Sequence, residues 1–239
     1  MEIYQTLKEE FSKLAANMLD EHISIISARP LSAKEAIGEP DRDDYPLIKG
    51  KEVMIEATFR GSKGHAFTDM PGKFEGNIRD VIALPLATNF ERAIFIASLN
   101  AVMRELGLIS GTVHCKDKEP AQCARELVDY VKERFGNPRI SFVGFQPAMI
   151  ERLSGQFEMR VLDLDDDNIG QKKFGLTIEG PEKTEEVLEW GDIILATGST
   201  SVNATINHFL GRKPVIFFGV TAAAVTKICG FERFCRYPH

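Results

Sequence analysis

The second half of the chain repeats a short apolar strand followed by a helix. Four stretches after Pro138 have the composition of buried strands, namely "RISFVGF", "FEMRVLDLD", "DIILAT" and "KPVIFFGV". Helices are predicted from Pro147 onward and at "PEKTEEVLEWG", "SVNATINHFLG" and "TAAAVTKICG". Strands that are apolar on both sides must be covered on both faces, which is typical of a parallel sheet between helices. The pattern predicts a Rossmann-like α/β domain with helices on both faces of its sheet.

The first part of the chain has a different pattern. Leu7, Phe11, Leu14 and Met18 share one face of a helix predicted over residues 4–19. Strands are predicted at "HISIISARP", rich in β-branched residues, and at the alternating "EVMIEATFR". The glycines of "GSKG" then favour a reversal into a returning strand at "HAFTD". We therefore predict a small antiparallel sheet with a helix, an α+β domain.

Two further helices are predicted in the middle of the chain. "TNFERAIFIASLNAVMRELG" opens with a capping box, Thr88 followed by Glu91, and ends at Gly107. It is apolar almost all round from residue 93 to 103, so we expect it between two layers. The predicted boundaries are 1–110 for the α+β domain and 111–239 for the Rossmann-like domain. The other helix, 120–135, could belong to either.

Composition restricts the class of protein. The 239 residues are 44% hydrophobic and 27% charged, which is ordinary for a globular protein with a real core. A net charge of -6 with scattered lysines and arginines argues against nucleic acid as a partner. The chain has no run of about 18 apolar residues and no basic leader before an apolar stretch. We expect no membrane partner and a cytoplasmic location, and the oligomeric state, a homo-oligomer included, stays open.

The four cysteines suggest neither a disulfide scaffold nor a metal site. Cys115, Cys123, Cys229 and Cys235 contain no C-x-x-C pair, and the spacing of the last two with His239 matches no structural zinc pattern. Free cysteine is among the most buried residues, so packed thiols are expected. The sequence names no metal and no cofactor, and the roles of Cys115, Cys229, Cys235 and His239 stay open.

Candidate ligand-binding residues follow the predicted parallel strands, because ligands collect beyond the carboxyl ends of such strands. Gly144 and Phe145 end the first strand, but G-x-G-x-x-G is absent, which weakens ordinary dinucleotide binding. Asp163 and Asp165 come about twenty residues later, where an acidic residue often binds a ribose hydroxyl.

The most polar of these strand ends is "LATGSTSVNATI", residues 195–206. Thr197, Gly198, Ser199 and Thr200 would form a turn into a helix whose free N–H groups could bind an anion. Asn203, one turn further on, could reach the same ligand. The alternative is that Ser199 or Thr200 only caps the helix and Gly198 only makes the turn.

The first domain supplies a second polar group of residues. His65, Thr68 and Asp69 follow the "GSKG" turn, and Asn89 and Asn100 lie on the long helix. His65 is the candidate catalytic acid-base residue, with Asp69 as its partner. The alternatives are a solvated His65, a structural hydrogen bond from Asn100 and a capping role for Asn89.

Four of these stretches resemble a family named for heavy-metal chelation: "GHAFTD", "ATNFERAIFIASLNA", "VGFQP" and "ATGSTSVNATI". The resemblance implies a domain like the N-terminal part of enolase followed by a Rossmann-like domain, with a ligand site between them. It implies a role in handling or making a metal chelator, by condensation or hydrolysis of a flavin-, pterin- or siderophore-like molecule. The site residues implied by the match are Thr197, Gly198, Ser199, Thr200, Asn203, Gly144, Phe145, His65, Thr68 and Asn100.

Three hypotheses of function follow. The first is an enzyme that acts on a small anionic or metal-chelating molecule in an interdomain cleft. The second is a non-catalytic protein that binds a metal or a metal chelate. The third, prompted by Gly144 with Asp163, is a Rossmann enzyme that uses a nucleotide or adenosylmethionine.

Overall fold

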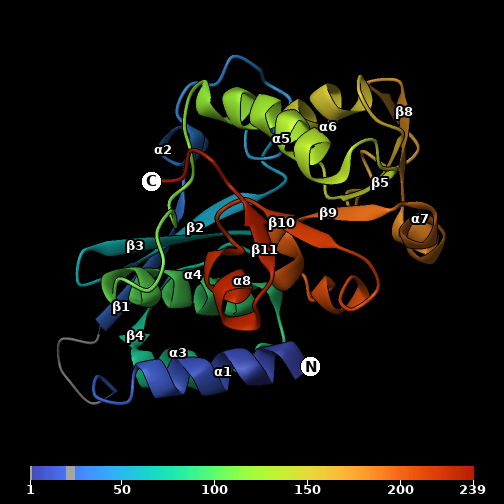
Figure 1. Ribbon diagram of the computed structural model, residues 1–239. Coiled ribbons are helices and arrows are strands. Elements are labelled where there is room, and N and C mark those ends of the chain that lie inside the picture. Colours follow the sequence, from blue (N-terminus) through green and yellow to red (C-terminus); the bar gives the residue numbers. More distant parts are fainter. Residues whose placement is uncertain (1, 20–24) are drawn as a thin grey trace.

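The computed structural model describes residues 2–19 and 25–239 (Figure 1). It contains one antiparallel sheet and one mostly parallel sheet, which confirms the predicted fold class. The first sheet has the strand order β3-β2-β1-β4. The second has seven strands in the order β11-β10-β9-β5-β6-β8-β7, all parallel to their neighbours except β7, which pairs antiparallel with β8.

The antiparallel sheet and its helices come from the first part of the chain. Their bounds are α1 (Glu2–Leu14), β1 (Ile25–Leu31), α2 (Ala33–Ile37), β2 (Val53–Phe59), β3 (Ser62–Thr68), β4 (Phe74–Asn77), α3 (Ile78–Ala83) and α4 (Asn89–Glu105). The predicted hairpin of β2 and β3 is confirmed, with Glu56 opposite His65. The strand predicted at "HISIISARP" begins at Ile25 in the structure, and the start of that stretch lies outside the described residues.

The four predicted strands of the second part are present as β5, β6, β9 and β10, but the strands β7 and β8 follow β6 without a helix between them. The bounds are α5 (Glu119–Phe135), β5 (Ile140–Val143), α6 (Pro147–Ser154), β6 (Met159–Leu162), β7 (Lys172–Lys173), β8 (Leu176–Glu179), α7 (Thr184–Trp190), β9 (Ile193–Thr197), β10 (Val215–Phe218), α8 (Ala223–Cys229) and β11 (Glu232–Phe234). Short 3₁₀ turns lie at η1 (Pro181–Lys183), η2 (Gly198–Ser201) and η3 (Ile206–His208).

The parallel sheet is buried on both faces, as its apolar strands predict. Along β9, Ile193 and Leu195 pack into a core with α5 and α6, while Ile194 and Ala196 pack into a second core with α4 and α8. Figure 1 shows α5 and α6 on one side of this sheet and α4 and α8 on the other. The domain boundaries stay a prediction.

The long helix α4 lies between the two sheets. The capping box of Thr88 and Glu91 is present, and every side chain from residue 92 to 103 is buried. One side of α4 packs on β2 and β3, and the other side contacts α8. The prediction that this helix lies between two layers is confirmed.

The predicted helix at "SVNATINHFLG" is wrong. Residues 198–208 form two separate 3₁₀ turns, η2 and η3. The side-chain oxygen Oδ1 of Asn203 accepts hydrogen bonds from the backbone N–H and the hydroxyl of Thr205, and Ala204 has a φ of 64°. Such side-chain bonds compete with helical ones, and a left-handed residue ends a helix. The opening helix is also shorter than predicted, because α1 ends at Leu14.

Candidate functional site

The parallel sheet has a switch point between β5 and β9, where the chain changes the side on which it adds strands. From β5 it proceeds outward through β6 to β8, and then returns to β9 on the other side of β5 before continuing to β10 and β11. The carboxyl ends of the strands on either side of such a switch point leave a crevice, which is where open α/β sheets bind ligands. Gly144 directly follows β5, and Thr197 ends β9.

A cleft of about 840 Å³ lies at this edge of the sheet. The ends of β5, β6, β9 and β10 form its floor, and the loop 38–52 and the end of β3 contribute to its walls. It is lined by most of the predicted ligand-binding residues, which are Thr68, Gly144, Phe145, Asp163, Thr197, Gly198, Ser199, Thr200 and Asn203. The predicted residues His65 and Asn100 are not part of this lining.

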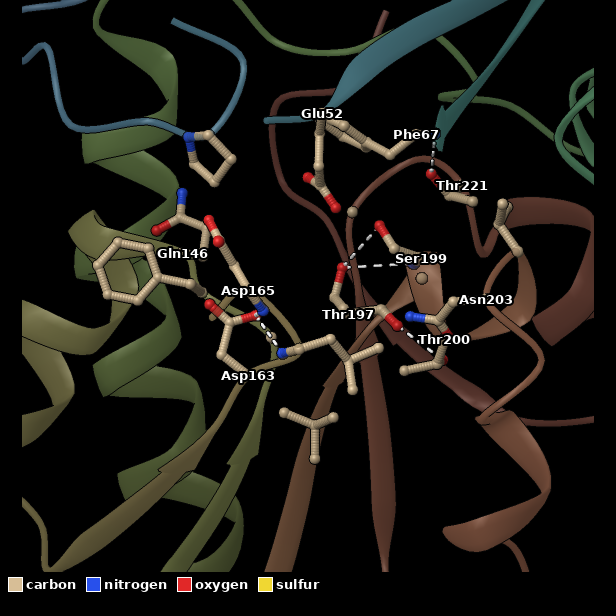
Figure 2. A pocket seen from close by; sticks show the side chains of 18 of the residues that line it. Glu52, Phe67, Gln146, Asp163, Asp165, Thr197, Ser199, Thr200, Asn203 and Thr221 are labelled. Carbon is tan, nitrogen blue, oxygen red and sulfur yellow. Dashed lines mark hydrogen bonds between the residues drawn. The ribbon is translucent and has the colours of Figure 1, made fainter. Parts of the chain in front are cut away.

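The polar turn after β9 uses most of its hydroxyl groups internally. Thr197, rather than Ser199 or Thr200, is the capping residue, and its hydroxyl oxygen accepts a 3.3 Å hydrogen bond from the Ser199 N–H. The Thr200 hydroxyl donates to the Thr197 carbonyl at 2.8 Å. Because η2 has only four residues, it offers much less than the helix N-terminus predicted for an anion. What remains for a ligand is the rim of the turn, with Ser199 and the Asn203 amide beside it (Figure 2).

Opposite this turn lies Glu52, which the sequence did not single out. Its carboxylate points into the cleft toward Thr197 and Ser199 (Figure 2). Burial, followed by the negative charges of Asp163, Asp69 and Asp165, raises the pKa of Glu52 to about 7. A carboxyl with this pKa exchanges protons readily at neutral pH, which is a property of catalytic acids and bases.

Sequence reasoning could not find Glu52 because its pKa depends on distant parts of the chain. Glu52 precedes β2, whereas Asp163 and Asp165 follow β6 and Asp69 follows β3. Locally, Glu52 is one polar position of an alternating strand. Nothing in the sequence around a carboxylate at this position indicates that three aspartates from other loops lie near it.

His65 is buried beneath the cleft wall, with 1% of its surface exposed. Its Nε2 lies 3.1 Å from a carboxylate oxygen of Glu56, and its Nδ1 accepts a 3.1 Å hydrogen bond from the His114 N–H. Asp69, the partner expected for His65, instead accepts a hydrogen bond from the Asn89 amide at 2.7 Å. The catalytic role of His65 stays a prediction.

Asn100 joins the two parts of the chain within the core. Its amide nitrogen donates to the carbonyls of His65 and Val220 at 3.0 and 3.3 Å, and its oxygen accepts the Ala224 N–H at 2.8 Å. The residue is fully buried. These bonds correspond to the structural alternative considered for this amide, and a ligand contact stays a prediction.

The cysteines are free thiols, and three of them line one wall of the cleft. These are Cys115, Cys123 and Cys235. Burial raises the pKa of the Cys115 thiol and that of Cys235, the latter to about 12. Within residues 2–19 and 25–239, no group of three or more histidine, cysteine, aspartate or glutamate side chains is arranged to hold a metal ion.

The fold and the cleft define a class: a two-sheet α/β protein with a cleft at the switch point of its parallel sheet. Residues 126–231 match the sequence model of the DUF364 family, described as "Putative heavy-metal chelation". No curated protein matches the chain. None of the described helices has the length and apolar character needed to cross a membrane.

Two solved structures of that family have a similar fold. One is a protein of unknown function from Pyrococcus horikoshii, 14% identical, with a TM-score of 0.56 over 92% of this chain and 80% of its own. The other, from Desulfitobacterium hafniense DCB-2, is also of unknown function and 12% identical, with a TM-score of 0.50 over 74% of this chain and 72% of its own. At these identities the similarity concerns the fold.

Proposed function

We propose that the protein is an enzyme that binds a small metal-chelating molecule in the cleft and that Glu52 exchanges a proton with it. The observation that carries the proposal is the position of Glu52. Its carboxyl faces the polar turn across the cleft, and its pKa is raised to about 7. A carboxyl that is about half protonated at neutral pH can both donate and accept a proton.

The shape and lining of the cleft favour a molecule with an apolar body and polar ends. Its volume of about 840 Å³ is in the range of small-molecule sites, and Tyr45, Phe67 and Phe145 supply aromatic walls. The Asn203 amide and the Ser199 hydroxyl can hydrogen-bond to oxygen or nitrogen atoms at one end. Flavin-, pterin- and siderophore-like compounds combine these features.

The distribution of charge orients such a molecule. Asp69, Asp163 and Glu52 all line the cleft, so hydrogen-bond donors or a bound cation of the ligand are favoured beside these carboxyl groups. A chelator brings its own metal ligands, so carrying a metal in this form requires no cluster of protein ligands. The family description fits a molecule of this kind.

In a hydrolysis or condensation, Glu52 would act at the bond that changes. As a general base it would take the proton from the attacking group, which is water in a hydrolysis and a hydroxyl or amine in a condensation. As a general acid it would give that proton to the leaving oxygen or nitrogen. The aromatic walls would keep water away from the carboxyl and so maintain its raised pKa.

A second function, a Rossmann enzyme that uses a nucleotide or adenosylmethionine, is favoured by the position of Asp163. This residue directly follows β6, the strand next to β5, where an acidic residue binds ribose hydroxyls in related folds. In the structure its carboxylate accepts hydrogen bonds from the Leu164 N–H and the Asn168 amide, both at 2.7 Å. A ribose would have to share or replace these bonds.

A panel of compounds tests these functions. Flavin mononucleotide, a pterin, catecholate chelators with and without Fe³⁺, and adenosylmethionine are added to the protein and thermal unfolding is measured. We expect a chelator-type compound to raise the unfolding temperature, and Asn203→Ala to weaken its binding about tenfold. Asn137→Ala, an exposed asparagine outside the cleft, is the matched control.

The outcomes separate the hypotheses. Binding that Glu52→Gln retains, with loss of chemical conversion of the bound compound, supports the enzyme. Binding with no conversion by the wild-type protein supports a non-catalytic chelate carrier. Stabilisation by adenosylmethionine alone supports the second function. If no panel compound binds, or if Asn203→Ala and Asn137→Ala bind equally well, the proposed cleft site is wrong.

A further inference from the structure

The segment that links the two sheets is fixed beside β3. The His65 N–H donates to the Thr112 carbonyl at 2.9 Å, and the Thr112 hydroxyl donates to the Lys63 carbonyl at 2.6 Å. On its other side Val113 exchanges two backbone hydrogen bonds of 2.9 Å with His239. Residues 112–114 are therefore held between β3 and the last residue of the chain.

His65 also holds this segment in place, and its two ring partners define its tautomer. Its Nδ1 accepts the His114 N–H, so the ring proton must be on Nε2, which faces Glu56 at 3.1 Å. Glu56 is also paired with Lys63 at 3.2 Å, and burial lowers the pKa of His65. Both ring nitrogens are thus engaged, and the neutral imidazole fixes the backbone of His114.

His114 itself lines the cleft. Its Nδ1 lies 2.6 Å from the Cys115 carbonyl oxygen, which can only accept, so Nδ1 carries the proton and Nε2 carries a lone pair. The ring packs edge-on against Phe67, at 5.5 Å between ring centroids. Burial lowers the pKa of His114 to about 4, so the ring is neutral at physiological pH.

The lone pair on His114 Nε2 is available. Among the described residues this atom has no hydrogen-bond partner, and the only fully buried side-chain nitrogen or oxygen without a partner there is Ser98 Oγ. Nε2 is therefore not sealed inside the protein, and the residue borders the cleft.

We infer that His114 presents a fixed neutral imidazole to the cleft, whose Nε2 accepts a hydrogen bond from an N–H or O–H group of the ligand, and that His65 is its positioning residue. The inference rests on the proposed function only in taking the cleft as the ligand site. The ligand must then carry an N–H or O–H donor on the side that faces β3. The inference also places the histidine of the site at position 114 rather than 65.

Diethyl pyrocarbonate tests whether the lone pair is open. An unprotonated imidazole nitrogen attacks one carbonyl carbon of this anhydride, a new N–C bond forms, and ethyl carbonate leaves while the ring N–H proton passes to water. At pH 5.5 an ordinary histidine is about 90% protonated and reacts slowly, but a ring with a pKa of about 4 is neutral. The modified residues are located by peptide mass spectrometry.

We expect the folded protein to be modified at His114 and not at His65, which should react only after unfolding in urea. The rate at His114 should change little between pH 5.5 and 7. Failure of His114 to react in the folded protein would overturn the inference. Because this measurement uses the free protein, it stands even if no compound of the panel binds. A compound that does bind in the cleft should slow the reaction at His114.

The positioning role of His65 has its own readout. Long-range ¹H–¹⁵N spectra report which ring nitrogen of His114 carries the proton, and His114→Gln assigns its signals. His65→Gln can accept the His114 N–H and donate to Glu56, so it should preserve the Nδ1–H tautomer and the modification rate. His65→Asn is too short to reach both partners and should alter both readouts. If His65→Asn and His65→Gln both leave them unchanged, His65 does not position His114.

Discussion

Gly144 lies directly against Thr197, at the switch point between β5 and β9 of the parallel sheet. A Cβ atom on Gly144 would come within 2.5 Å of Thr197 Cγ2, and the glycine has a φ of 96°. Only glycine combines this backbone conformation with such close approach. The contact brings the carboxyl ends of β5 and β9 together and sets the position of the Thr197 hydroxyl at the floor of the cleft.

Gly144→Ala should therefore cost about 2–3 kcal/mol in the free energy of unfolding, from backbone strain and from displacement of Thr197. The control is Gly170→Ala. Gly170 has a φ of 79° but no atom within 4 Å of an added Cβ, so only the strain of about 1 kcal/mol applies. Urea denaturation measures both variants, and equal losses would show that the contact with Thr197 contributes nothing.

Glu52 should make the protein less stable as the pH rises. Below pH 4.5, its ordinary pKa, the carboxyl is protonated in the folded and unfolded states alike, so it does not lower the free energy of unfolding. Above its folded pKa of about 7 the full cost of a buried charge applies. Glu52→Gln should thus be more stable than the wild type by about 2 kcal/mol at pH 8, allowing for solvent screening, and about equal to it at pH 4.

The neighbouring carboxylates provide a check on this explanation. Asp163 is the largest of the charges that raise the pKa of Glu52. Asp163→Asn keeps an acceptor oxygen for the Leu164 N–H and removes the charge. In the Asp163→Asn background, Glu52→Gln should therefore raise the free energy of unfolding at pH 8 by less. A gain that is unchanged by Asp163→Asn would mean that the charges do not interact.

Asn100 and Ser98 are both fully buried in α4, but they differ in their partners. Asn100→Ala leaves the Ala224 N–H and the His65 carbonyl without their partner and should cost about 2–4 kcal/mol. Ser98→Ala removes a hydroxyl that has no partner within the described residues, so its cost should be near zero. Thermal and urea unfolding compare the two, and similar losses would argue against the role given to Asn100.

Arg42 fastens the loop 38–52, which forms part of the cleft wall. It donates hydrogen bonds to Asp44 at 2.6 Å and to Glu151 on α6 at 2.7 Å, and it packs over the Phe174 ring at 5.5 Å. Arg42→Gln should speed hydrogen exchange in this loop and cost about 1 kcal/mol in stability. Arg152→Gln, an exposed change on the same helix α6, should do neither.

Local patterns in the sequence predict much of this fold. The apolar strands β5, β9 and β10 and the capping box of α4 follow from periodicity and cap chemistry alone. The carboxyl ends of parallel strands meet at one edge, so Gly144, Asp163 and Thr197 could be placed together before the structure was known. The short elements β4, α3, β7 and β11 carry too few residues for a clear period and were not predicted.

The remaining features depend on contacts that no local pattern contains. The turn after Thr197 was predicted to open a helix, but the hydrogen bonds that Thr205 donates to the Asn203 side chain compete with helical ones. Glu56 was one polar position of a strand, yet the strand register places it opposite His65. It is therefore Glu56 that pairs with His65, a role that was expected of Asp69. The lone pair on His114 Nε2 depends on the Cys115 carbonyl, which accepts the Nδ1 proton, and on the position of this residue at the cleft.

The buried position of α4 has a consequence for unfolding. One continuous hydrophobic core contains Phe59 and Ala66 of the antiparallel sheet, Phe95 and Leu99 of α4, and Phe217 of the parallel sheet. Separating α4 from the antiparallel sheet on one side, or from α8 on the other, would expose apolar surface of this shared core. The chain should therefore melt in a single cooperative transition, with equal calorimetric and van't Hoff enthalpies, wherever a domain boundary is drawn.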